Sequence, residues 1–580
     1  MTQEIDRTWD LTSLYAGFDD PAYAADREEL SALVDAYAAR VDELAKAGAF
    51  DADALAQLLE MEERMWVLGA DLTKFTSLSQ AVDAADAVAQ ASMGKLNAIF
   101  ARMALPTSLV CRWTAELELT EDDFARLPVL DAYRFLIGQM AERGRHMLSP
   151  EEENLFARVQ PFAGQAWVDQ RNVLVSFASA ELDGRKRSLT ELRNFATSND
   201  ADLRRRAFDA EIECSRSIEQ GMSFCLNGIK AQESMEAQMR GYASVLDLTM
   251  AQSHMKAATL DALWTSVRAH LPLFHAYMRK KAQMLGHEGG LPWWDVLAGV
   301  GACSRVFSID DARDYLVKHL ARFAPDLGEL VERAFANRWI DFYPRMGKSG
   351  GAFCRNLTNQ RESRVLTNFD GSLKAVTTIA HELGHAYHGQ QIEDHRPLNR
   401  TYTMPVAETA SNFNEILVMN AAIAEAEGAE RLALLEQRLQ ACTQTVCDIY
   451  SRFLFEKSVI EQNQEGFLFP EKLCELMVAA QKEAYGDGLD ANALHPYMWV
   501  NKVHYNFPYA FGLLLSAGLY ERYQVAGPAF AEKYRRMLAS TTVCTVEEAA
   551  AVAGVDVTTV EFWDSCFAAV ALQIEEFLQA

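Results

Sequence analysis

Apolar residues recur every three or four positions along most of this chain, and this spacing predicts a mainly α-helical protein. In the first long stretch Val34, Tyr37 and Val41 would share one face of a helix. Only 15 Pro and 31 Gly occur in 580 residues, so few positions interrupt such helices. The same pattern predicts helices over residues 51–68, 80–104, 124–144, 202–236, 259–284, 310–323 and 327–335.

Three short segments instead have the composition of β-strands. Residues 172–177 read Asn-Val-Leu-Val-Ser-Phe and precede a turn at Asp183-Gly184, which predicts a small hairpin. Residues 351–357 and 364–369 are two further strand-like runs, and the turn at 368–371 ends the second. We therefore expect a small sheet late in an otherwise helical chain.

The length of the chain predicts more than one hydrophobic core. A chain of 580 residues divides into two to four domains or lobes by ordinary size limits. No fixed-period repeat or low-complexity linker marks a boundary, but helices resume after the predicted hairpin, near residues 185–205. We predict an N-terminal helical lobe over 1–195 and a second domain over 196–580.

Charge and cysteine content limit the partners and the compartment. The net charge is −26, which argues against nucleic acid or an anionic membrane as the main partner. The ten Cys include no C-x-x-C pair and are expected to be reduced and buried. No signal peptide is visible, and the apolar run 509–520 is too short to span a bilayer. The sequence thus predicts a cytoplasmic protein, of an oligomeric state that it does not reveal.

The motif that carries chemistry is His381-Glu382-Leu383-Gly384-His385, an H-E-x-x-H pattern. On a helix His381 and His385 lie on one face, so both imidazoles can bind one metal ion. Glu382 lies beside them, where it can act as a general base on water. The pattern predicts a hydrolytic site that binds one Zn²⁺ per chain.

Such a site needs a third protein ligand from another element. The extended pattern of one zinc-peptidase group requires Gly at 388 and His at 391, but the chain has His388 and Gln391. Glu393 and Asp394 would fall at the end of the metal helix.

Two later carboxylates are better placed to complete the site. Glu408 and Glu415 are seven residues apart on a second predicted helix that begins near Pro405, and hence share a face. Small residues around Glu408 allow two helices to approach closely. We predict Glu408 as the third ligand and Glu415 as an acceptor for a ligand imidazole N–H.

The predicted sheet directly precedes the metal helix. An exposed strand edge there could bind an extended peptide by strand addition, with Gly350, Gly351 and Ala352 contacting the substrate backbone. The alternative is that these strands only pack beneath the helix.

Three motifs together are similar to one peptidase family. Residues 381–386, 408–415 and 347–352 resemble the oligoendopeptidase F branch of the thimet-oligopeptidase family, and the similarity extends over about 201–523. The resemblance implies a mainly helical, two-lobed, bowl-like or clam-like fold with zinc deep in a channel. It also implies cleavage of short peptides, with His381, His385 and Glu408 as ligands and Glu382 as general base and proton shuttle.

A downstream segment supplies candidate donors for the oxyanion of the transition state. His504, Tyr505 and Tyr509 lie in a stretch that resembles the family's C-terminal catalytic segment. Here the His-Tyr pair and the Phe-Pro-Tyr run are almost fused, whereas the family separates them by several more residues. We predict active-site roles for all three side chains.

Two other functions fit parts of the same pattern. A carboxypeptidase or dipeptidyl carboxypeptidase on a similar scaffold would need a cation for the substrate's terminal carboxylate, and Lys348, Arg400 or Lys502 could serve. A non-catalytic peptide-binding protein could hold structural zinc, although such a site would not need Glu382.

Overall fold

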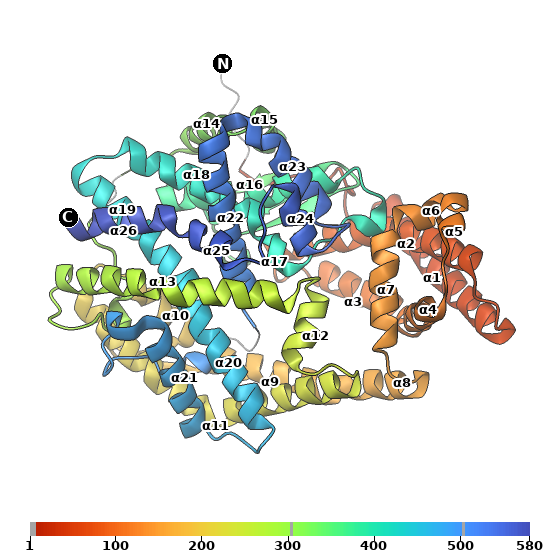
Figure 1. Ribbon diagram of the computed structural model, residues 1–580, viewed down its shortest axis with the longest axis horizontal. Helices are drawn as coiled ribbons and strands as arrows, with labels where there is room; N and C mark the ends of the chain where they lie inside the picture. The colour runs from red at the N-terminus through yellow and green to blue at the C-terminus, as the bar shows by residue number, and fades with distance from the viewer. Residues whose placement is uncertain (1–6, 302–304, 501–504) are drawn as a thin grey trace.

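The described chain, residues 7–301, 305–500 and 505–580 of this computed structural model, is almost entirely helical. Figure 1 shows the first helices, in red and orange, grouped on one side of the molecule and the later helices stacked on the other. One two-stranded and one three-stranded sheet are the only sheets in the part of the chain that the structure describes. The mainly α, two-lobed class predicted from the sequence is confirmed.

The N-terminal helices pack around a core of their own, which runs from Tyr15 to Met140. Their apolar faces follow the predicted spacing, since Val34, Tyr37 and Val41 are all buried. The helix predicted over 80–104 is wrong in one respect, because the chain breaks at Asp83 and Asp86 caps a new helix. The helices are α1 (Pro21–Ala47), α2 (Ala52–Val82), α3 (Ala87–Ala101), α4 (Ala104–Glu116), α5 (Glu121–Arg126), α6 (Pro128–Ala132) and α7 (Arg134–Arg145).

The next section joins the two sides of the molecule. It comprises α8 (Pro150–Val159), α9 (Gly164–Phe177), β1 (Ser179–Leu182), β2 (Arg185–Ser188), α10 (Leu189–Asn194), α11 (Ala201–Met239) and α12 (Val245–Gln252). The hairpin forms around Asp183 and Gly184, both with positive φ, as a two-residue turn of this twist requires.

The strand predicted over residues 172–177 is wrong, because this run is the last part of α9. A short apolar run with β-branched residues suits either structure. Here α9 packs along α11, and glycines on α11 let it approach closely. A Cβ at Gly228 would lie 2.6 Å from Nε1 of Trp167, and one at Gly221 would lie 2.8 Å from Leu174.

The remaining chain is built on one large core of buried residues that extends from Met250 to Phe577. Its first elements are α13 (Ala257–Met284), α14 (Ile309–Leu320), α15 (Pro325–Ala336), β3 (Ile340–Asp341), β4 (Phe353–Leu357), β5 (Glu362–Leu366), α16 (Leu373–Ile392), α17 (Met404–Ala407) and α18 (Thr409–Glu425). They are followed by α19 (Gly428–Thr443), α20 (Ile449–Asn463), α21 (Pro470–Tyr485), α22 (Phe507–Ala526), α23 (Phe530–Ser540), α24 (Val546–Val552), α25 (Val560–Cys566) and α26 (Ala568–Gln579).

The predicted small sheet lies directly before α16, as expected. Its strand order is β3-β5-β4, with β4 antiparallel to β5 and β3 parallel to it. The strand β4 is therefore an edge strand, and it packs on α16. An edge strand has unpaired backbone groups to which an extended peptide can bind.

Several other sequence predictions concern the chain as a whole. All described cysteines are free thiols, and no described helix has the length and apolar character needed to cross a membrane. A small buried cluster from Ala178 to Cys214 extends across residue 195. The division into domains over 1–195 and 196–580 remains a prediction.

Candidate metal centre

The helices α16 and α18 lie close together at one glycine of the H-E-x-x-H motif. A Cβ on Gly384 would lie 2.5 Å from Cα of Ser411 and closer still to the carbonyl oxygen of Ala410. Asn414 reinforces the pair, since its Nδ2 donates to the Ala380 carbonyl over 3.2 Å. Small residues on both helices thus bring the motif next to the segment that begins at Glu408.

This close approach makes Gly384 a sensitive position for stability. Gly384→Ala forces α16 and α18 apart, and we expect the free energy of unfolding to fall by about 1–3 kcal/mol. Gly94→Ala is the matched control, because Gly94 is helical and a Cβ there would contact nothing. The control should gain about 0.5–1 kcal/mol, and denaturant unfolding measures both. Equal stability changes in the two variants would contradict this packing.

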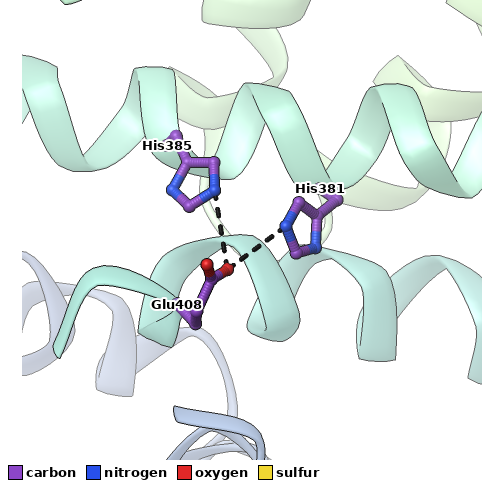
Figure 2. Close-up of side chains that lie close together, drawn as sticks. All are labelled: His381, His385 and Glu408. Carbon is purple, nitrogen blue, oxygen red and sulfur yellow. Dashed lines mark ion pairs between the residues drawn. The ribbon is translucent and has the colours of Figure 1, made fainter. Parts of the chain in front are cut away.

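Three of the predicted side chains come together where α16 faces the start of α18. Figure 2 shows His381 and His385 pointing from α16 toward Glu408, and their ligand atoms lie within 4.8 Å of one another. Glu408 Oε2 is 3.3 Å from Nε2 of His381 and 3.6 Å from Nε2 of His385. All three side chains remain partly exposed, so a small ligand can reach them.

The spacing of these atoms fits a tetrahedral metal ion. Ligands bound at the usual distances of His and Glu to Zn²⁺, in a tetrahedron, lie about 3.4 Å from one another. Two His and one Glu is moreover a donor set of catalytic zinc sites, which leave one position open. These three residues therefore fit a metal ion.

The side chains at the centre shift one another's pKa values. Burial opposes the charged form of His381, but the carboxylates of Glu408 and Glu415 outweigh it and raise its pKa to about 10. Burial and the charge of His381 lower the pKa of His385 to about 4. Although burial opposes the ionised form of Glu408, the two imidazoles lower its pKa to about 2. Opposite charges on His381 and Glu408 thus stabilise one another.

Glu415 also meets His381, although the helix that was predicted to carry both carboxylates is broken. The chain leaves helical geometry at Glu408, which has φ −90° and ψ 3° between α17 and α18. Glu415 Oε2 still lies 3.4 Å from Nδ1 of His381, on the ring nitrogen opposite Glu408. Ser411 donates to Glu408 Oε2 over 2.9 Å. These contacts orient the imidazole and the carboxylate.

Glu382 is buried beside the three candidate ligands. Only 5% of the residue is exposed. Burial, partly offset by His381, raises the pKa of its carboxyl to about 7. A cation at the three ligands would lower this pKa again. A carboxylate of this kind can accept and release a proton near neutral pH.

The downstream segment reaches the centre through α22. A Cβ on Gly512 would lie 2.7 Å from Cβ of Glu408, so the glycine allows this side of α22 to pack closely against the base of the Glu408 side chain. Tyr509 is three residues earlier on α22 and hence lies on the same face, one turn away. Tyr505 instead packs on Phe453 of α20, with ring centres 5.4 Å apart. His504 lies outside the described residues.

The residues predicted to contact the substrate backbone lie just before β4. Gly350 and Gly351 are exposed, and Ala352 is partly exposed. Asn368 Nδ2 donates to the Gly351 carbonyl over 2.8 Å, which fixes this loop. Further along β4, burial and the nearby charge of Glu382 raise the pKa of the Cys354 thiol. The open edge of β4 therefore begins close to the candidate base.

Tyr402 is an aromatic residue near the centre that no sequence motif marks. Tyr402 stacks on His388, with ring centres 3.9 Å apart, and burial together with the charges of Cys354 and Glu408 raises the pKa of its hydroxyl. His388 is fully buried and its Nε2 lies 2.8 Å from Oγ1 of Thr541, so it belongs to the interior. The only sequence signal for Tyr402 was its position just before the second helix.

Comparison with known proteins gives a consistent result over nearly the whole chain. Residues 194–568 match the model of peptidase family M3, and residues 117–174 match the model described as oligopeptidase F. The Group B oligopeptidase PepB of Streptococcus agalactiae is 26% identical over 96% of this chain and 94% of the relative. An oligoendopeptidase F homolog of Lactococcus lactis is 23% identical over 97% of this chain and 95% of the relative.

Solved structures share the fold. A Chlamydophila abortus chain matches with a TM-score of 0.81 at 21% identity, covering 99% of this chain and 98% of that chain. Oligoendopeptidase-F from Enterococcus faecium matches with a TM-score of 0.71 at 19% identity, covering 96% of this chain and 98% of that chain.

Proposed function

Because the chain belongs to peptidase family M3, we propose that it is a zinc-dependent endopeptidase that hydrolyses bonds within short oligopeptides. The match to the oligopeptidase F model and the oligoendopeptidase F relatives agree with the resemblance seen in the sequence. Members of this family are metallopeptidases. The zinc assignment rests on the convergence of His381, His385 and Glu408 beside the buried Glu382.

In the proposed mechanism the chain's own residues hold and move protons around the scissile bond. His381, His385 and Glu408 would hold Zn²⁺, which when bound supplies a Lewis acid that polarises a carbonyl and acidifies water. Glu382 accepts the proton of the attacking water and delivers it to the leaving amine nitrogen. Glu415 keeps the imidazole of His381 in place by accepting from its Nδ1.

Negative charge on the carbonyl oxygen needs a further hydrogen-bond donor. Tyr509 is the candidate best supported by position, since it lies one turn from the glycine that contacts Glu408. We retain His504 and Tyr505 as proposed donors of the same segment. The edge of β4, with Gly350, Gly351 and Ala352 before it, would align the peptide backbone.

A carboxypeptidase would need a cationic side chain to bind the terminal carboxylate of its substrate, and the structure limits which side chains could do so. Lys348 is excluded as a carboxylate clamp because its ammonium group is fully buried and bonds to Asp341 and the Thr367 carbonyl. Arg400 donates to the His395 carbonyl and to Asn359 Oδ1. Lys502 lies outside the described residues. The remaining alternative, structural zinc in a peptide-binding protein, leaves the buried Glu382 without a role.

Matched peptides with a free or an amidated C-terminus separate an endopeptidase from an exopeptidase. We expect both peptides to be cleaved at the same internal bonds with similar kcat, because the scissile bond is remote from the terminus. Product masses and initial rates at saturating peptide measure this. An enzyme that released only terminal residues and failed on the amidated peptide would contradict the proposal.

A further inference from the structure

Two adjoining cavities lie between the N-terminal helices and the chain that follows them. One has a volume of about 490 Å³ and the other of about 520 Å³. They share the four wall residues Thr107, Arg143, Tyr242 and Gln252. Residues of α7 and α12, both labelled in Figure 1, contribute to the walls of both cavities. The two cavities therefore meet at these four residues and together make up the space between the two groups of helices.

This space ends next to the candidate metal centre. Tyr402 and Thr403 line the first cavity, and Glu408 follows Thr403 by five residues, across the single turn of α17. Five helical residues advance the chain by only about 7.5 Å. Tyr402 also stacks on His388, one turn after His385 on α16. A peptide bound at the centre can thus extend into the space.

Most of the exposed surface of the first cavity is apolar, and Trp66, Phe135, Leu136 and Met140 line it together with Tyr402. Such walls bury substrate side chains, whereas a few polar groups fix orientation. The charged groups of the walls therefore decide which substrate end or side chain is accepted.

Each carboxylate of these walls already has a partner. Glu62 accepts from the hydroxyl of Tyr37, and Glu142 pairs with Arg145. His146 lies 3.4 Å from the same Glu142. The carboxylates Glu153 and Glu236 both pair with Arg240.

Arg143 differs from these groups. It is exposed, lines both cavities, and donates through Nη2 to the thiol of Cys111 over 2.8 Å. Its charge partly offsets the burial that raises the pKa of the Glu62 carboxyl. No ion pair joins Arg143 to a carboxylate in the described part of the chain. A guanidinium with free donors in a largely apolar space is a ready partner for a carboxylate.

We infer that Arg143 binds a carboxylate of the peptide substrate and so determines which peptides are preferred. The inference rests on the proposed peptidase function. The carboxylate is either the free C-terminus or an Asp or Glu side chain, since both offer the same two oxygens. Because Arg143 is not one of the residues that converge at the candidate metal centre, it acts on binding and leaves the chemical step unchanged.

Three matched peptides and the variant Arg143→Gln test this inference. The first peptide has neutral side chains and a free C-terminus, the second is amidated, and the third is amidated with Glu as its last residue. We expect Arg143→Gln to raise KM about ten- to a hundredfold for the first or the third peptide, with kcat unchanged. KM for the amidated neutral peptide should stay the same. A rise in KM confined to the first peptide identifies the free C-terminus as the group that Arg143 binds. A rise confined to the third peptide identifies an acidic side chain.

Two further variants serve as controls. Arg134→Gln is the matched control, since Arg134 is on the same helix but pairs with Glu121 and lines neither cavity. It should change none of the three KM values, and Arg143→Lys should recover part of the lost binding. An equal rise in KM for all three peptides, or no rise for any of them, would overturn the inference. Absence of cleavage by the unmodified chain would instead refute the proposed peptidase function.

Discussion

Replacing Glu382 with Gln lowers the rate of peptide cleavage by at least about 10²–10⁴-fold, the usual contribution of a general base. Gln has the same size and still forms hydrogen bonds, but it cannot accept the proton of the attacking water. Because Glu382 is not one of the three converging ligands, bound metal should remain at one ion per chain. Initial rates with a fluorogenic oligopeptide and elemental analysis measure the two quantities.

The matched control for this variant is Glu393→Gln. Glu393 lies at the end of the same helix and pairs with Arg361 at the surface. Its replacement should change cleavage by less than about threefold, since surface ion pairs contribute little. Activity retained by Glu382→Gln, or a loss of metal that explains its inactivity, would show that Glu382 is not the base.

Replacing Glu408 with Ala removes both the metal and the activity. Two imidazoles remain, and the third side of the site loses the oxygen that lies 3.3 Å and 3.6 Å from them. Loss of an outer-shell partner alone costs 10- to 100-fold in metal affinity, so loss of a ligand should cost more than about 100-fold. Competition with a chromogenic chelator measures the affinity for Zn²⁺.

Glu425→Ala provides the comparison for this experiment. Glu425 ends the same helix, α18, and pairs with Lys318 away from the centre. Its replacement should leave both zinc affinity and cleavage unchanged, while thermal unfolding confirms that both variants are folded. If the Glu408→Ala chain bound zinc as tightly as the unmodified chain, another residue would have to be the third ligand.

The parts of this protein that could be predicted from sequence are those that local spacing determines. Three- and four-residue periodicity gave the helices, and the i, i+4 spacing of His381 and His385 placed both rings on one face. Glu408 could be selected because small neighbours allow a helix to approach, and Gly384 supplies the close contact on the other side.

What could not be predicted depends on contacts between distant segments. Residues 172–177 have the composition of a strand, but they form the end of the helix α9. The glycines of α11 allow this helix to pack closely on α11. The break at Glu408 was hidden, because a helix ends directly before it and another begins directly after it. Tyr402 and Arg143 carry no motif, and only the fold brings them to the same cavity.

The central claim is that the chain is a zinc-dependent endopeptidase with its metal at His381, His385 and Glu408. Mass spectrometry of the products from a mixed peptide library, with chelator and with Zn²⁺ added back, tests it most directly. The predicted result is cleavage at internal bonds that stops with chelator and returns with Zn²⁺. Cleavage that continues unchanged in the presence of chelator, or release of terminal residues alone, would contradict the claim.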